Sequence, residues 1–344
     1  MIGAGFHLRK VALAAVLTTA GGALLAGWHT YRSLTTPGPA PSHEGEATVI
    51  SVFVPDGQPL WATADRLVEQ RVISGKTLFV LWGRLTGMDR RVKGGEFSFS
   101  TPLTPLEVLR ILVSGRNARR LVTIPEGMTL KGVADLLASR GFGPSEGFLC
   151  LNEDPEFLSA WGLPPEGLEG YLYPDTYAFS RTMRPVEIVG RMVERFHEVF
   201  SPSMQRRAEE LGLSVHEAVT LASVIEKETH VPEERSLVAA VFHNRLRLGL
   251  PLQSDPTVIY GLEDFDGDLT RRHLQTPTRY NTYATAGLPP GPIANPGFES
   301  LLASLNPAPV AYLYFVARGD GRHHFSGSLA EHNRAVGRFQ KGRR

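Results

Sequence analysis

SVHEAVTLASVIEKET, from Ser214 to Thr229, is the stretch that decides most about the fold and the chemistry of this chain. Ser214 and Glu217 form an S-x-x-E capping box, which predicts a helix that begins at Ser214. At about 100° per residue, Glu226 falls on the apolar stripe of that helix, with Val215, Val219 and Ala222. A carboxylate on an apolar stripe is costly unless something uses it, so we interpret Glu226 as a candidate general acid.

Glu228 lies two positions beyond Glu226 and is predicted to point to roughly the opposite side of the helix. The two side chains are therefore not expected to act as a facing pair. A bland alternative stays open at this point, namely that Glu226-Lys227-Glu228 is a solvated helix end.

Long helical patterns with Pro/Gly loops surround this stretch, and they extend to the C-terminus. Apolar periodicity predicts helices at residues 185–200, 235–250 and 329–339. Leu288 to Pro296 (LPPGPIANP) is predicted to be irregular because of its prolines. Ala311 to Val316 is predicted to be a buried strand, and His323 to Ser326 its partner.

The N-terminal half contains a weak internal repeat. Val54-Pro55-Asp56-Gly57 recurs as Ile124-Pro125-Glu126-Gly127, and each copy is typical of a strand, a turn and a helix. Between the copies we predict a strand near 94–98 and helices at 58–73, 78–85 and 105–113. The fold class is therefore α+β, with long helical patterns after Pro155.

An uncharged run from Val11 to Trp28 follows His7, Arg9 and Lys10. Its length of about 18 residues is near the lower limit for a membrane-spanning helix. The preceding cations predict a cytoplasmic N-terminus at residues 1–10, and a body outside the cytoplasm. A cleaved signal peptide is the alternative. Residues 29–46, rich in Pro, Gly and polar side chains from Thr35 on, are predicted to be a linker.

The composition excludes several classes of protein. The 36 Lys and Arg residues nearly balance the 35 Asp and Glu residues, so nothing indicates a nucleic-acid partner. Cys150 is the only cysteine, which rules out an internal disulfide and a Cys/Cys zinc pair. We interpret His323, His324 and His332 as strand, turn and helix residues rather than as metal ligands. The sequence has no G-x-S-x-G, P-loop or H-E-x-x-H motif.

Two further segments carry candidate polar side chains. Asp255, in QSDPT, precedes a proline and is predicted to project from a loop. RYNTY, from Arg279 to Tyr283, places aromatic rings beside amide and hydroxyl groups, a combination that suits a sugar site. The alternative for this segment is a packed surface loop.

Five blocks of the sequence, in order, resemble the YceG/MltG endolytic transglycosylases. They are LEGYLYPDTY (168–177), ASVIEKET (222–229), VFHNRLRLGLPLQSDPTVIYG (241–261), YNTYATAGLPPGPIANPG (280–297) and HHFSGSLAEHN (323–333). The resemblance implies a transmembrane helix at 11–28, a small LysM-like domain at 47–120 and a catalytic domain with a small sheet at 121–344. It also implies cleavage of the MurNAc–GlcNAc β-1,4 bonds of nascent peptidoglycan strands, which leaves 1,6-anhydro ends and ends strand elongation.

The resemblance further implies that Glu226 is the catalytic acid and base. Six residues are implied to line or support the glycan cleft: Glu169, Gln253, Asp255, Tyr280, Asn281 and Asn295. No metal or organic cofactor is expected. The expected partners are glycan strands, the cell membrane through a single-pass anchor, and, by analogy, peptidoglycan synthases. Two rivals stay open: an inactive peptidoglycan-binding scaffold, and a hydrolase that uses Glu226 and Asp255 as two carboxylates.

Overall fold

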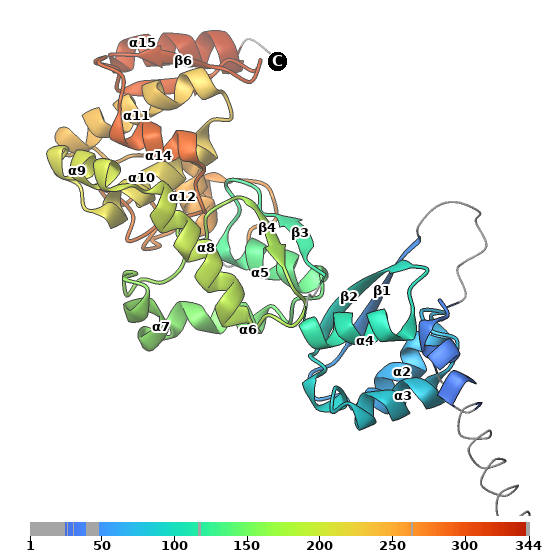
Figure 1. Cartoon of the computed structure of the whole chain (residues 1–344). Helices are drawn as coiled ribbons and strands as arrows, with labels where there is room; N and C mark the ends of the chain where they lie inside the picture. The colour runs from blue at the N-terminus through green and yellow to red at the C-terminus, as the bar shows by residue number, and fades with distance from the viewer. Residues whose placement is uncertain are drawn as a thin grey trace, which may run out of the picture. The chain divides into compact units, whose positions relative to one another are not determined.

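The computed structural model describes residues 25, 27–29, 31–38, 48–115, 118–262 and 264–341 (Figure 1). The chain divides into two compact units. One unit contains the residues up to Arg120 together with 180–182, and the other contains 121–179 and 183–344. Short two-stranded sheets and many helices make up the described residues, which confirms the α+β class.

The first unit is built on an antiparallel pair of strands. β1 (Thr48–Val54) pairs with β2 (Gly95–Thr101), with Val52 opposite Phe97. The alternating side chains Val52, Val54, Phe97 and Phe99 are buried, since one face of the pair packs on helices. Those helices are α2 (Leu60–Glu69), α3 (Lys76–Leu85) and α4 (Pro105–Ser114), with a 3-10 turn η1 (Asp89–Arg91). The predicted elements of this unit are confirmed, although α2 is shorter than the helix predicted at 58–73.

Most of the predicted span at 11–28 lies outside the described residues. In the part that the structure describes, no helix has the length and apolar character needed to cross a membrane. Within the predicted linker, residues 31–35 are helical and the side chain of Leu34 is buried.

The second unit begins with the second copy of the repeat. β3 (Arg120–Thr123) pairs with β4 (Thr176–Phe179), and the Pro-Glu-Gly turn leads into α5 (Leu130–Ser139). Gly57 and Gly127 occupy the same place in the two turns, with φ of 73° and 72°, a conformation that favours glycine. Short helical segments follow α5 and precede β4: α6 (Glu146–Leu149), η2 (Cys150–Glu153) and α7 (Pro155–Ala160).

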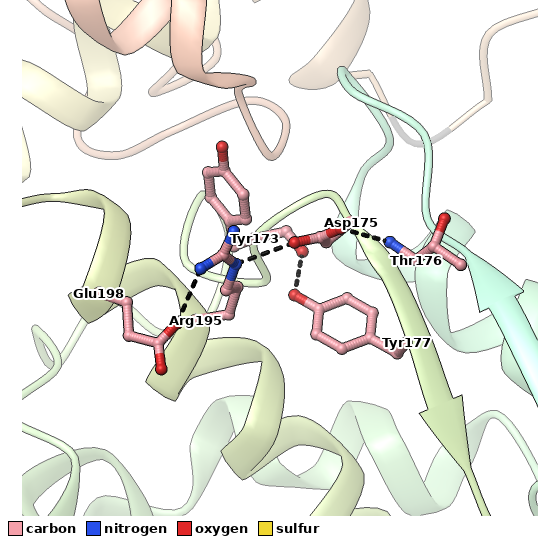
Figure 2. Close-up of polar contacts among 6 residues, drawn as sticks. All are labelled: Tyr173, Asp175, Thr176, Tyr177, Arg195 and Glu198. Atoms are coloured by element: carbon pink, nitrogen blue, oxygen red, sulfur yellow. Dashed lines mark hydrogen bonds and ion pairs between the residues drawn. The ribbon is translucent and has the colours of Figure 1, made fainter. Parts of the chain in front are cut away.

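A polar cluster ties the start of β4 to α8 (Pro185–Val199) (Figure 2). Arg195 on α8 donates to Asp175 Oδ2 and to Glu198 Oε2, both at 2.8 Å. The hydroxyl of Tyr177 donates to the carbonyl of Tyr173 at 2.6 Å. The end of the LEGYLYPDTY block thus braces α8 in this structure.

α10 (Val215–Glu228) is the central helix of the second unit, and its Ser214–Glu217 capping box is present as predicted. Every residue from Ala218 to Glu226 is buried, because α10 contacts helices on several sides. Its neighbours are α9 (Pro202–Glu210), α11 (Pro232–Arg247), α12 (Asp255–Tyr260) and α14 (Phe298–Leu305), and α13 (Arg271–Gln275) contacts α12. α11 begins three residues before the helix predicted at 235–250, since Pro232 suits the first helical position.

A hairpin and a terminal helix complete the second unit. β5 (Tyr314–Ala317) pairs antiparallel with β6 (His323–Ser326), and α15 (Leu329–Val336) packs on both, followed by one π turn, η3 (Gly337–Lys341). The buried strand predicted at 311–316 is corrected by this arrangement. β5 starts later, and only Val316 is fully buried, because a two-stranded sheet leaves its side chains partly open.

Candidate functional site

The two glutamates at the end of α10 point to different surroundings, as the helical spacing predicts. Glu226 has 5% of its surface exposed. Its Oε2 accepts a hydrogen bond from the backbone N–H of Gly297 at 3.1 Å, and its Oε1 lies 3.8 Å from Nη2 of Arg235. Gly297 precedes the first residue of α14, so Glu226 holds the start of that helix.

The Pro-Glu-Gly turn of the second repeat packs beside Glu226. The N–H of Gly127 donates to the carbonyl of Asn295 at 2.8 Å, and the N–H of Asn295 donates to the carbonyl of Met128 at 2.9 Å. A Cβ on Gly297 would overlap the carboxylate of Glu126, so only glycine leaves room for this contact. Burial raises the pKa of Glu126, and the charge of Glu226 adds to this effect. The sequence repeat contains this turn, but it does not indicate that Glu126 is a neighbour of Glu226.

Glu228 lies at a different place, beside the QSDPT segment. The Ser254 hydroxyl donates a hydrogen bond to Glu228 Oε1. Burial raises the pKa of Glu228 to about 7; the Ser254 hydrogen bond opposes this and the charge of Asp255 adds to it. A carboxyl group with such a pKa is protonated in a large fraction of molecules at neutral pH.

A cavity of about 500 Å³ opens in front of Glu228. One wall is polar, with Glu228, Gln253, Asp255 and Tyr283. The other wall comes from the hairpin and α15. Figure 1 shows these elements near the C-terminal end of the chain. It contains aromatic, histidine and amide side chains: Tyr314, Phe315, His323, His332 and Asn333. Aromatic rings and hydrogen-bonding groups that line one cavity suit a sugar ring.

Glu226 is not one of the residues that line this cavity. This cavity is thus lined by Glu228 instead, and the expectation that Glu226 is the helical carboxylate in the glycan cleft stays a prediction. The physical reason is that α14 and the Pro-Glu-Gly turn cover the side of α10 that carries Glu226. The solvated helix end is excluded too, since both carboxylates are held by partners.

Arg245 shapes the loop that carries Gln253 and Asp255. Its Nη1 donates to the carbonyls of Pro251 and Leu252, at 2.9 and 3.1 Å, and to Gln253 Oε1 at 3.0 Å. Its Nε donates to the carbonyl of Leu313, just before β5, at 2.7 Å. The guanidinium also lies 5.0 Å from the centre of the Tyr314 ring. This one buried side chain therefore joins the two walls of the cavity.

Gln253 and Asp255 are the two expected cleft residues that line the cavity. Gln253 has φ of 53°, a left-handed conformation that the Arg245 hydrogen bond helps to hold. Asp255 does not project from a loop, as was predicted, because it is the first residue of α12. A helix start places its side chain at the cavity, since Pro256 is tolerated in the first turn.

Glu169 and Asn295 form an internal network instead. The carboxylate of Glu169 accepts from the N–H of Leu130 at 2.9 Å, from the hydroxyl of Tyr260 at 3.1 Å and from Asn295 Nδ2 at 3.3 Å. Burial raises the pKa of Glu169 to about 7, against these hydrogen bonds. Asn295 Oδ1 accepts from the N–H of Leu172 at 2.8 Å. The two residues thus support the site by joining α5, α12 and the irregular segment.

Tyr280 and Asn281 are also supporting residues in this structure. The ring of Tyr280 packs edge-on against Tyr260, with centroids 4.8 Å apart. Asn281 is completely buried, and its Nδ2 donates to the carbonyls of Leu274 and Thr276 at 3.0 and 2.7 Å. Its Oδ1 accepts from the N–H of Tyr283 at 2.9 Å. The amide is therefore occupied by the chain itself rather than offered to a ligand.

The three histidines near the C-terminus have partners of other kinds. His323 Nδ1 lies 2.7 Å from Glu234 Oε2, and the His332 ring stacks on Tyr314 with centroids 5.2 Å apart. The His324 ring contacts that of Phe339, with centroids 5.7 Å apart. In the described part of the chain, no three His, Cys, Asp or Glu side chains are grouped so that they could hold a metal ion.

Arg245, Ser254 and Tyr283 belong to the site but were not predicted from the sequence. Ser254 and Tyr283 lie inside the candidate segments QSDPT and RYNTY. Arg245 lies inside the 241–261 block that carries part of the family resemblance. None of these signals tells which side chain points into the cavity.

Comparisons with known proteins agree with the resemblance found in the sequence. The model of the YceG-like family matches residues 52–338. The chain is 29% identical over 340 residues to the endolytic murein transglycosylase of Bacillus subtilis, covering 93% of this chain and 90% of that protein. An endolytic murein transglycosylase of Streptococcus pneumoniae is 25% identical over 321 residues, and the match spans 58% of its length.

A solved structure also matches. The crystal structure of a yceG-like protein from Listeria monocytogenes is 32% identical to this chain, with a TM-score of 0.59. The match covers 83% of this chain and 98% of the Listeria chain.

Proposed function

The chain belongs to the YceG-like family, and from that premise we propose that it is a peptidoglycan lytic transglycosylase. It cleaves the β-1,4 bond between MurNAc and GlcNAc within glycan strands and leaves a 1,6-anhydro-MurNAc end. The relatives named endolytic murein transglycosylases support the activity. The observation that carries the proposal is the protonatable carboxyl of Glu228 in the wall of a cavity suited to a sugar ring.

We propose Glu228 as the catalytic acid and base. Protonated Glu228 donates its proton to the glycosidic oxygen as the bond from that oxygen to C1 of MurNAc breaks. The C6 hydroxyl of the same sugar then forms a bond to C1, and its proton passes to the Glu228 carboxylate. Glu228 is protonated again at the end, and no water is consumed. The tethered nucleophile has the effective-molarity advantage of an intramolecular reaction.

Three features support Glu228 over Glu226, which the sequence pattern favoured. Glu228 lines the cavity and has a pKa suited to a proton donor at neutral pH. Glu226 is enclosed, and its carboxylate is occupied by Gly297 and Arg235. The family resemblance implies Glu226, so the choice of Glu228 rests on the cavity and on the contacts of the two carboxylates.

The products of purified glycan strands test the proposed function. We expect strands whose new ends are 1,6-anhydro-MurNAc, one water lighter than a reducing end in mass spectrometry. Digestion in H₂¹⁸O should introduce no label, because the nucleophile is the C6 hydroxyl. Reducing ends that carry ¹⁸O would replace this proposal with the hydrolase rival. A protein with no activity on purified strands would favour the inactive scaffold.

We propose further that the chain is anchored in the cell membrane through residues 11–28, with both compact units outside the cytoplasm. The cations Arg9 and Lys10 before the run support this orientation. Alkaline phosphatase, which is active only outside the cytoplasm, should be active when fused after residue 50, and a cytoplasmic reporter fused there should be inactive. The opposite pair of results would overturn the orientation. The LysM-like identity of residues 47–120 and any contact with synthases stay predictions of the sequence.

A further inference from the structure

Asp255 and Tyr283 form a hydrogen-bonded pair in the wall of the cavity that holds Glu228. The Tyr283 hydroxyl donates to Asp255 Oδ1 at 2.6 Å. Burial raises the pKa of Tyr283, and so does its hydrogen bond to Asp255. The phenol therefore keeps its proton and remains a donor to Asp255 over the whole neutral range.

The two residues of the pair belong to two chain segments that are hydrogen-bonded to each other. The N–H of Gln253 donates to the carbonyl of Thr282 at 3.1 Å, and the N–H of Ser254 donates to the Thr282 hydroxyl at 3.0 Å. The N–H of Tyr283 donates a hydrogen bond to Oδ1 of the buried Asn281 side chain. Asp255 and Tyr283 thus have fixed positions relative to Ser254, which in turn hydrogen-bonds Glu228.

The charged and titratable groups around Glu228 come from several elements. α12 provides Asp255, and α11 provides Arg245, whose donors are turned toward carbonyls and Gln253. The hairpin and α15 provide His323, Tyr314 and His332, and the RYNTY segment provides Tyr283. His323 is paired with Glu234, and burial lowers the pKa of His332, which keeps that ring neutral. Asp255 is therefore the anion in this wall that acts on Glu228.

We propose that Asp255, held by Tyr283, is a positioning residue whose negative charge keeps Glu228 in its proton-donating form, and that it is not a nucleophile. Two carboxylates in one partly buried site do not both ionise easily, so one of them retains a proton. Asp255 is the more exposed of the two and has the Tyr283 donor, so it carries the negative charge. The inference rests on the proposed role of Glu228 as the acid.

The dependence of kcat/KM on pH tests this inference, because its basic limb reports the ionisation of the essential acid. With Asp255→Asn we expect the maximum to stay within about threefold of the unaltered enzyme. The basic limb should move to lower pH by about one unit. At a fixed pH above the limb, kcat/KM should therefore fall approximately tenfold. Lowering the pH should restore the activity. Tyr283→Phe should move the limb in the same direction by less, and Asp255→Glu should leave it in place.

Matched measurements separate the positioning role of Asp255 from a structural role, from a role as nucleophile or base, and from a failure of the proposed function. Asp264→Asn removes an exposed carboxylate that does not line the cavity, and should leave the profile unchanged. If Asp255→Asn lowers the rate equally at every pH, the residue acts only through structure. If it abolishes activity at every pH, Asp255 is a nucleophile or base, and either result overturns the inference. Reducing ends made by the unaltered enzyme would instead contradict the proposed function, whatever the position of the limb.

Discussion

Glu228→Gln should lower the turnover of purified glycan strands by at least about a hundredfold, since general acid–base catalysis is lost with the titratable group. Glutamine keeps the size of the side chain, and its oxygen can still accept from Ser254. Glu226→Gln is the matched control two positions away. It weakens the pairing with Arg235 and should cost about 1–3 kcal/mol of unfolding free energy. Its turnover should stay within several-fold of the unaltered enzyme at a temperature where it is folded.

Unfolding in urea at two pH values shows whether Glu228→Gln keeps its fold. The pKa of Glu228 is about 7 in the folded protein, above its ordinary value of 4.5, so the folded state binds this proton more tightly. The contribution of the Glu228 carboxyl to the free energy of unfolding is present below pH 4.5 and is lost as the pH rises through 7. Glutamine does not ionise, so the variant keeps its stability over this range. Its free energy of unfolding relative to that of the unaltered protein should therefore rise between about pH 5 and pH 8. If Glu226→Gln is folded and inactive while Glu228→Gln is active, the acid is Glu226, as the sequence pattern predicted.

Arg245→Met should lower the free energy of unfolding by about 3 kcal/mol or more, because it leaves buried acceptors without a donor. The carbonyls of Pro251, Leu252 and Leu313 all lose their hydrogen bond to this side chain. Methionine is unbranched and apolar, so the main loss is of donors and charge rather than of packing. Activity should also fall, since the Gln253–Asp255 segment loses its support.

Arg247→Met provides the control for this variant. Arg247 is two residues further on the same helix, is exposed, and donates to Asn244 Oδ1. An exposed polar contact of this kind contributes below about 1 kcal/mol. Urea unfolding of both variants at one pH measures the difference. Equal effects would mean that the buried guanidinium does not hold the loop, and that the cavity walls have another support.

The elements of this fold with strong local signals could be predicted from the sequence. The capping box at Ser214 and the apolar period that follows it predict the start of α10 to within one residue, because a helix start depends on groups within one turn. The Pro-acidic-Gly turns were found in the same way, since both require glycine at a left-handed position. α14 was missed: it is short, its flanking Gly297 makes no side-chain cap, and the segment before it is irregular.

The chemistry of the site could be predicted only in part. The sequence by itself determined that Glu226 lies on the apolar stripe of its helix and that Glu226 and Glu228 face different ways, because both follow from helical periodicity. Only the tertiary structure decided which side of α10 meets a cavity, since that depends on where α14, the Pro-Glu-Gly turn and the C-terminal hairpin pack. It likewise decided that the amide of Asn281 is used by carbonyls of Leu274 and Thr276. Contacts between residues distant in sequence are set by packing, which no local pattern encodes.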